Sequence, residues 1–549
     1  MTQADEDSRS DEDSDRSYSS IEEEINPTPK SPQELLSAAV MDQYNRRVFN
    51  DIPAHLIYIP SMQIIERSEL FNILRPDKIT HTEIDRIPCP PYLTRSPALW
   101  QEERVHDVVE HLTRYAIFSH RWLPAGEPTF QDMSVFSTTK PKPTGPGYEK
   151  LTKFCETARA HGCILAWSDT CCINKESSSE LDEAIRSMFR WYRNAHICIA
   201  YLAESESLRN FKHDAWFTRG WTLQELLAPS RIVFYGKGWR ALGDGLARDS
   251  KASIVDEDIM YAVSRVTGIS EDELCGFEAG TDMIHMKMTW ASKRQTTRLE
   301  DRAYSLLGIF DVSMTVAYGE GTKAWDRLME LLVKECHEWE VFGGAAAFCE
   351  TLPPSPDRYL AVTPAAAEII RRDRYLEPWQ RPGDRFFKLT KRGLKARLLV
   401  VEVKQLKECP DNCHWKALTY CPMHVTLTSV PCNANSPNNE RATFCPVSLE
   451  ENTADSDDIV YHQYGDYDQW GFGIANYAYL DGDVGEVEAG KSYVFVLLGR
   501  KELDGGRKSS WKKIYTGKVF AVRCEQTMQS PLTTVWLENS WNSFSTASR

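Results

Sequence analysis

Residues 163–202 read CILAWSDTCCINKESSSELDEAIRSMFRWYRNAHICIAYL, and this stretch decides the fold class. Its two ends, residues 163–168 and 197–202, are short apolar runs typical of buried strands. Between them, apolar side chains recur at the three- and four-residue spacing of a helix with one buried stripe: Leu181, Ala184, Ile185, Met188, Phe189 and Tyr192. A strand, a crossover helix and a second strand predict a unit of a parallel sheet.

The same alternation continues on both sides of this unit. Upstream, residues 115–119 (YAIFS) predict a buried strand, and residues 148–161 predict a helix that ends at Gly162. Downstream, residues 216–229 predict a further helix and residues 231–235 a fourth strand. We therefore expect an α/β domain with a parallel sheet and helices on both faces, whose ligands would lie beyond the carboxyl ends of the strands.

The segment WFTRGWTLQELLAP at residues 216–229 contains a single acid, Glu225, among aromatic residues. One interpretation is a capping box, in which Thr222 and Glu225 satisfy free backbone NH groups at the helix start. The other is a functional carboxylate. At about 100° per residue, Leu223, Leu226 and Leu227 share one face and Glu225 points away beside Trp221, which leaves its carboxylate free to face a cleft.

A chain of 549 residues with 42% apolar residues is too long for one core, so two or three domains are expected. Residues 253–340 read as helical, and β-rich patterns begin near residue 359. The expected divisions are an acidic tail, a lead-in packed on the main domain, the α/β domain, a helical annex and a C-terminal antiparallel β domain (1–32, 33–110, 111–245, 246–345 and 346–549).

More than half of the formal net charge of −15 lies in the first 24 residues, which hold ten acids and two bases. Such a self-repelling segment predicts disorder over residues 1 to about 32. The sequence has no apolar run of membrane-spanning length, and its N-terminus is unlike a signal peptide. These features predict a cytoplasmic protein with no membrane span, in which most of the 15 cysteines are reduced. A basic nucleic-acid footprint is lacking, so no nucleic-acid partner is expected.

Four blocks resemble the fungal heterokaryon incompatibility (HET) domain in order and spacing: residues 115–122, 167–175, 188–195 and 217–226. The resemblance covers about residues 115–235, and residues 289–310 look like the helical region that commonly follows this domain. It implies non-self recognition between fungal cells with regulated cell death as the outcome, an unknown protein trigger, and self-association through the domain.

The HET domain is in turn similar to Toll/interleukin-1 receptor (TIR) domains, some of which cleave NAD between nicotinamide and ribose. That similarity implies a flavodoxin-like parallel sheet, Glu225 as the catalytic residue and NAD as a substrate, with no cofactor required. The candidate ligand-binding residues are Ser119, His120, Arg121, Trp122, Asp169, Arg219 and Trp221. The chain departs from the TIR pattern at Thr222, which stands where the pattern has cysteine, and at Arg219-Gly220. The alternative function is a non-enzymatic module that signals by self-assembly.

Three further motifs are weaker. Residues 485–492 (GEVEAGKS) match the Walker A pattern, but a strand-like run follows them, so a β-turn is expected. Cys171-Cys172 near His120 suggests a Cys/His nucleophile pair, although adjacent cysteines cannot both face one cleft. Cys and His residues between 409 and 445 are irregularly spaced, so no metal site is predicted: Cys409, Cys413, His414, Cys421, His424, Cys432 and Cys445.

Overall fold

The structure is a computed structural model. It describes residues 32–80, 97–124, 126–134, 143–243, 246–247, 257–336, 339–342, 352–360, 364–374, 387–390, 393–405, 425–427, 443–446, 468–480, 483–513, 520–524 and 527–537. The predicted disorder of the acidic tail and six of the candidate metal ligands, Cys409 to Cys432, lie outside these residues. The chain divides into two compact units, residues 1–46 with 74–112, and residues 47–73 with 113–549.

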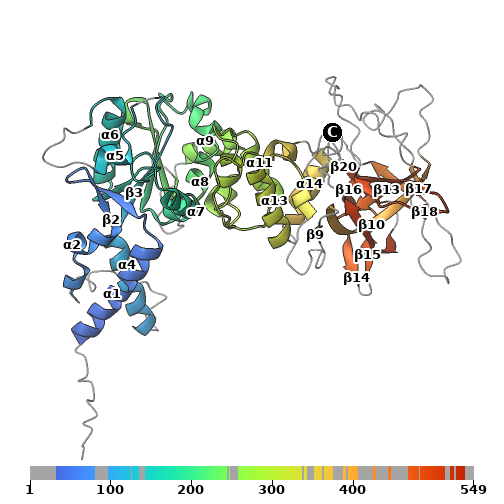
Figure 1. The fold of residues 1–549 in the computed structure, drawn as a ribbon, viewed down its shortest axis with the longest axis horizontal. Helices are drawn as coiled ribbons and strands as arrows, with labels where there is room; N and C mark the ends of the chain where they lie inside the picture. The colour runs from blue at the N-terminus through green and yellow to red at the C-terminus, as the bar shows by residue number, and fades with distance from the viewer. Residues whose placement is uncertain are drawn as a thin grey trace, which may run out of the picture. The chain divides into compact units, whose positions relative to one another are not determined.

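The smaller unit holds most of α1 (Pro32–Asn50), the 3-10 turn η2 (Pro76–Lys78) and α4 (Pro97–Leu112) (Figure 1). The remaining lead-in elements, β1 (His55–Tyr58), β2 (Gln63–Glu66), η1 (Arg67–Glu69) and α2 (Leu70–Leu74), fall within or at the border of the larger unit.

Four parallel strands form the centre of the main sheet (Figure 1). They are β3 (Tyr115–His120), β4 (Leu165–Trp167), β5 (Ile197–Tyr201) and β6 (Arg231–Gly236). Their spatial order is β4-β3-β5-β6, with Ile117 opposite both Trp167 and Cys198. The parallel part of the sheet thus starts in the middle with β3, winds one way to β4 and then the other way to β5 and β6. This reversal places a topological switch point between β3 and β5, where open α/β sheets bind ligands.

The predicted parallel strands are confirmed, but the sheet as a whole is mixed. The hairpin of β1 and β2 adds antiparallel to β4 at one edge. At the other edge, β7 (Arg240–Ala241) and β8 (Leu246–Ala247) pair antiparallel with β6. These short strands cover backbone groups that the edges of the parallel sheet would otherwise leave unpaired.

Helices cover both faces of the sheet. Side chains alternate along each strand, so both faces carry residues that pack against helices. On one face, Phe118 stacks on Phe154 of α6 (Pro146–Ala160) with ring centroids 4.3 Å apart. On the other face, the Tyr115 hydroxyl donates to the backbone carbonyl of Trp191 in α7 (Ser178–Asn194). The Ser177 side chain caps α7 by accepting from the NH of Glu180. The short elements α5 (Phe130–Ser134), η3 (Phe211–His213) and η5 (Lys237–Trp239) complete the domain.

The predicted helix at 216–229 is divided into η4 (Ala215–Thr218) and α8 (Thr222–Leu227). All six residues of α8 are buried, so the prediction that Glu225 points away from a packed face into a cleft is wrong. The reason is that Glu225 turns toward β3, where its carboxyl accepts a hydrogen bond from the buried Ser119. The capping interpretation is not observed either, because Trp221 is the N-cap without a side-chain cap, and the Thr222 hydroxyl donates to two backbone carbonyls, those of Trp216 and Arg219.

A second body of helices is the helical annex, defined here as the described residues 257–336. It contains α9 (Glu257–Thr267), α10 (Glu271–Cys275), α11 (Ile284–Ser292), α12 (Asp301–Tyr304) and α13 (Lys323–Glu335) (Figure 1). It contacts α7 through the NH of Val316, which donates to Asp182 Oδ1 over 2.8 Å. At Gly308 a Cβ atom would collide with Phe189 of α7, so the two bodies pack at backbone distance there.

The C-terminal part is β-rich and antiparallel, as predicted. The turns η6 (Trp339–Phe342) and η7 (Pro356–Leu360) and helix α14 (Pro364–Arg374) precede it. The main sheet has the order β11-β12-β20-β16-β13-β10-β22, with β9 on β10 and β19 on β16. Its strands are β9 (Phe387–Thr390), β10 (Gly393–Gln405), β11 (Val425–Leu427), β12 (Thr443–Pro446), β13 (Gln469–Ile474), β16 (Ser492–Arg500), β19 (Lys512–Lys513), β20 (Phe520–Cys524) and β22 (Thr533–Leu537).

A three-stranded sheet has the order β14-β15-β21, with β14 (Ala478–Leu480), β15 (Val484–Val487) and β21 (Met528–Pro531), and a hairpin joins β17 (Glu502–Leu503) to β18 (Arg507–Lys508). The Walker-like residues 485–492 connect β15 to β16 through a turn with Gly490 at φ 78°. A strand follows this turn where a phosphate-binding loop needs a helix, which confirms the predicted turn.

Candidate functional site

The carboxyl ends of β3, β4 and β5 meet at the switch point, and polar residues gather there. Ser119 and His120 are the last two residues of β3, and both are buried. Because successive side chains alternate, Ser119 lies on the face of α7 and α8 and His120 on the face of α6. Asp169 follows β4, and Glu225 comes from α8 after β5.

Glu225 is held by a hydrogen-bonded chain inside the domain. The Ser119 hydroxyl donates to Glu225 Oε2 over 2.5 Å, and the indole NH of Trp216 donates to the same hydroxyl over 2.8 Å. Glu225 is only 5% exposed. Burial and the nearby charge of Asp169 raise the pKa of Glu225 to about 8, against the opposing effects of Ser119, Arg219 and Arg294. The carboxyl is therefore protonated at neutral pH.

Asp169 is the contrasting carboxylate. The indole NH of Trp122 donates to its Oδ2 over 2.8 Å, and His120 Nε2 lies 3.3 Å from its Oδ1. Burial alone would raise the pKa of Asp169, but the His120 contact and the charges of Lys175 and Arg219 outweigh burial and hold the pKa at about 2. Burial lowers the pKa of His120 itself, and its contact with Asp169 opposes this effect. The Asp169 side chain is 20% exposed, and its Oδ1 atom is buried.

Trp122 forms a ring platform beside this anion. Its indole is 38% exposed, and its position is fixed by the hydrogen bond to Asp169. The Lys175 ammonium lies 4.3 Å and the Arg219 guanidinium 5.4 Å from its ring centroids. Arg219 also donates to the backbone carbonyl of His120 over 3.3 Å. The platform thus combines an aromatic face with two cations and one carboxylate.

The α6 side of the site contains a second ionic group. Lys150 of α6 donates to Glu127 and, over 3.2 Å, to the backbone carbonyl of Arg121. His120 Nδ1 lies 4.0 Å from the Glu127 carboxylate, and neither ring nitrogen of the buried His120 makes a hydrogen bond. A buried imidazole with two unsatisfied nitrogens between two carboxylates is unusual, since buried polar atoms are normally hydrogen-bonded.

Six of the eight residues singled out from the sequence come together here: Ser119, His120, Trp122, Asp169, Arg219 and Glu225. The other two point elsewhere. Arg121 pairs with Glu204 at 2.9 Å on the surface, and Trp221 acts on Asp301 of the annex, whose pKa it lowers.

Sequence reasoning missed Lys175, Lys150, Glu127 and Arg294. Lys175 lies in one of the four HET-like blocks and Arg294 in the annex block, so the blocks held a signal for these two. Lys150 and Glu127 lie outside the blocks, and only the fold brings them to the site.

The adjacent cysteines do not form a nucleophile with His120. Cys171 and Cys172 are both buried, and burial raises the pKa of the Cys172 thiol well above its usual range. A buried, protonated thiol is a poor nucleophile. Their role is packing beneath the loop that follows β4.

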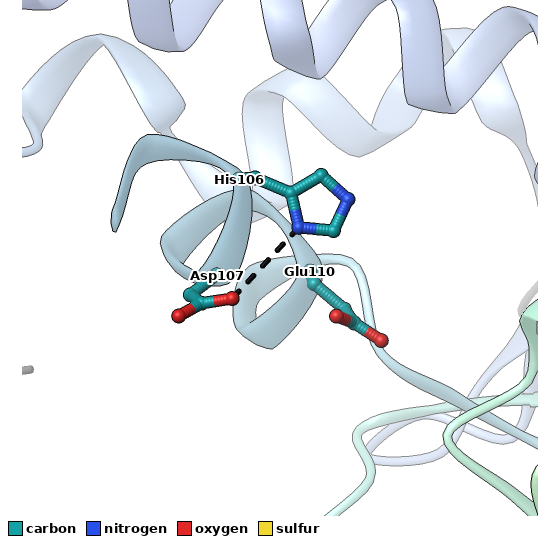
Figure 2. A group of neighbouring side chains, drawn as sticks. All are labelled: His106, Asp107 and Glu110. Atoms are coloured by element: carbon teal, nitrogen blue, oxygen red, sulfur yellow. Dashed lines mark ion pairs between the residues drawn. The ribbon is translucent and has the colours of Figure 1, made fainter. Parts of the chain in front are cut away.

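One group of potential metal ligands occurs among the described residues, on α4 of the smaller unit: His106, Asp107 and Glu110. Figure 2 shows these side chains on neighbouring turns of the helix, with His106 Nδ1 3.8 Å from Asp107 Oδ1. His106 and Asp107 are exposed, and Glu110 is partly exposed. Exposed acidic groups of this kind are common on helix surfaces without a bound ion, so this group supports no metal site.

Comparison with known proteins matches part of the α/β domain to one family. Residues 115–214 match the family model for heterokaryon incompatibility protein (HET). Over 234 residues the chain is 39% identical to the vegetative incompatibility protein HET-E-1 of Podospora anserina, an alignment that covers 40% of this chain and 16% of that protein. The chain therefore spans a small part of the curated relative it matches. No solved structure matches the chain significantly. Within the described residues, no helix is long and apolar enough to cross a membrane. The two matches support a HET domain in this chain, of the kind found in fungal incompatibility proteins.

Proposed function

We propose that this chain acts in heterokaryon incompatibility, as a non-self recognition protein whose HET domain triggers regulated cell death. We propose further that the domain is TIR-like and acts by cleaving NAD between nicotinamide and ribose. The main support is the pair Glu225 and Asp169 at the switch point. The protein pushes the pKa values of these two carboxyl groups apart, to about 8 and about 2. Such separation is typical of acid and base groups in active sites.

The proposed reaction adds water to the anomeric carbon of the ribose while nicotinamide leaves with the electrons of the glycosidic bond. The products are ADP-ribose, nicotinamide and one proton. The ribose acquires oxocarbenium character, which a carboxylate stabilises. In this proposal Glu225, once ionised, is that carboxylate. Trp122 stacks on a ring of the dinucleotide, and Arg219 binds its pyrophosphate.

The alternative is a non-enzymatic module that signals by self-assembly, and the burial of Glu225 favours it. A carboxyl that is 5% exposed and bonded to Ser119 contacts protein on nearly every side. In this alternative Glu225 belongs to the polar interior of the domain. For the enzyme, side chains over Glu225 must move before a ribose reaches it.

The deciding experiment incubates the purified full-length chain with NAD and follows nicotinamide release by chromatography. Glu225→Gln keeps the size of the side chain and resembles its protonated form, so this variant should remain folded. We expect it to lower nicotinamide release at least about 100-fold, as removal of an electrostatic group in an active site does. Glu156→Gln, which changes an exposed carboxylate on α6, is the matched control and should leave the rate unchanged.

Two results would contradict the NAD proposal. One is equal turnover by the wild type and Glu225→Gln. The other is no turnover by a folded wild-type chain under conditions in which it self-associates, and this second result would favour the alternative module.

A further inference from the structure

The annex contacts the segment that carries Glu225 through main-chain pairing. The NH of Gly220 donates to the carbonyl of Gln295 over 2.8 Å, and the NH of Gln295 donates to the carbonyl of Thr218 over 2.6 Å. These bonds form a parallel bridge between Arg219 and Gln295. Residues 294–296, called the docking segment below, are thus fixed against the turn that leads into α8.

Arg294 extends this contact toward the site. Its guanidinium Nη1 donates to the Thr222 hydroxyl over 2.7 Å and to the carbonyl of Arg219 over 3.0 Å. Thr222 is the first residue of α8, so Arg294 ties the annex to the start of the helix that bears Glu225. The positive charge of Arg294 lowers the pKa of Glu225, and the charge of Glu225 raises that of Arg294. Although burial lowers the pKa of Arg294 to about 9, the guanidinium is charged at neutral pH.

Charged and titratable groups from several elements act on Glu225. They are Asp169 after β4, Arg219 before α8, Arg294 of the annex, Tyr192 of α7 and Cys198 of β5. Asp169 disfavours an ionised Glu225, and burial keeps Tyr192 and Cys198 uncharged. The favourable charges are therefore two arginines, of which Arg219 also interacts with Asp169.

We propose that Arg294 is a positioning residue for Glu225: by docking on α8, the annex brings a countercharge to the helix that bears this carboxyl. The site of the α/β domain is then complete only with the docking segment in place, and release of this segment makes ionisation of Glu225 harder. This inference deepens the proposed function and rests on Glu225 being its reactive group.

The test measures the protonation of Glu225 without relying on turnover. In the full-length chain, the free energy of unfolding is compared between Glu225 and Glu225→Gln at a series of pH values. The difference between the two changes with pH until the carboxyl in the folded state is ionised and then levels off. The pH of this upper bend is the midpoint of Glu225 ionisation in the folded chain. The comparison is repeated with Arg294→Gln, with Arg294→Lys, and with the control Lys293→Gln, which removes an exposed charge from the adjacent position.

We expect Arg294→Gln to move the midpoint to higher pH, Arg294→Lys to restore part of the shift, and Lys293→Gln to leave it unchanged. An unchanged midpoint in Arg294→Gln would overturn the proposal. If NAD is cleaved, the pH profile of nicotinamide release should shift in the same direction. If NAD is not cleaved, the midpoint still decides the role of Arg294, so the failure of this inference differs from the failure of the enzyme proposal.

A second perturbation keeps both arginines. A Cβ atom at Gly220 would collide with Thr296 Cγ2, so Gly220→Ala pushes the docking segment away from α8. Thr296→Ser removes this methyl group and keeps the hydroxyl that donates to the carbonyl of Arg298. We expect Gly220→Ala to raise the midpoint and Gly220→Ala with Thr296→Ser to restore it. A Gly220→Ala chain with a wild-type midpoint would contradict the proposal, even if Arg294→Gln fails to fold.

Discussion

Replacement of Glu225 by glutamine removes an ionisable group from the interior and keeps its shape. The folded chain holds a proton on Glu225 up to about pH 8, whereas an unperturbed glutamate releases its proton near pH 4.5. Between these pH values the folded state binds more protons than the unfolded state, so the stability of the wild type falls as the pH rises. Below about pH 4.5 the full stabilisation is present, and above about pH 8 it is lost.

The expected size follows from these two pKa values. A separation of about 3.5 pH units corresponds to about 5 kcal/mol over the whole range, at about 1.4 kcal/mol for each unit. About 3.5 kcal/mol of this falls between pH 5 and pH 8, as an order of magnitude. Glu225→Gln lacks this loss, so its stability relative to the wild type should increase by that amount across the interval. In a domain of this size, the difference in melting temperature should grow by about 10 °C.

Differential scanning calorimetry of the full-length chain at pH 5, 6, 7 and 8 measures this difference, and transitions of the C-terminal β part should be common to both proteins. Glu156→Gln, on the exposed side of α6, should show no such trend. A melting difference between wild type and Glu225→Gln that is constant with pH would refute the assignment of a buried, protonated carboxyl.

Three further changes test the surroundings of this group. Asp169→Asn should remove about 2 kcal/mol of the loss in unfolding free energy that the wild type shows on acidification, because the stability from an Asp169 pKa of about 2 is present above pH 3.8 and lost as the pH falls through 2. Urea unfolding at pH 2 to 5 measures this loss, and an equal loss in the variant would contradict an ionised Asp169. Ser119→Ala leaves the buried Trp216 NH without its acceptor and should lower the free energy of unfolding by about 2 kcal/mol in urea at pH 7. A loss near zero would show that the hydrogen bonds of Ser119 do not stabilise the fold. Gly308→Ala should destabilise the chain by at least about 2 kcal/mol because its methyl group meets Phe189, and a tolerated alanine would show that annex and α7 are not in close contact.

The parallel core of the sheet was predictable because its signals are local. Residues 163–202 contain two apolar runs and a helical stripe, and they form β4, α7 and β5 nearly as expected. The edge strands were not predictable in the same way. Leu56 and Ile57 belong to the four-residue strand β1, which joins the main sheet by pairing with β4, more than 100 residues later. Pairing between strands so far apart in the sequence depends on the assembled fold, and a short apolar run does not indicate its partner.

The candidate site was predictable in position but not in environment. Topology places the ends of β3, β4 and β5 together, so the meeting of Ser119, Asp169 and Glu225 follows from the strand order. Burial of Glu225 could not be read from α8, because the leucine face and the Glu225 face are both covered. Glu225 bonds to Ser119 of β3, and the start of α8 contacts Arg294, about 70 residues later in the chain; no periodicity in α8 indicates either contact.

The same contacts determine which segment of the chain is needed for the proposed activity. The family match ends at residue 214, whereas Glu225, its supporting helix and Arg294 all lie beyond it. A segment cut at the end of the match would lack Glu225, and one cut before the annex would lack Arg294 and the backbone pairing of Gln295. In either segment, absence of NAD cleavage would reflect missing parts of the site. The enzyme and self-assembly proposals can therefore be separated only in a chain that keeps residues 115–336 in their native contacts. In such a chain, the pH midpoint of Glu225 first establishes that the annex is docked, and nicotinamide release then distinguishes the two functions.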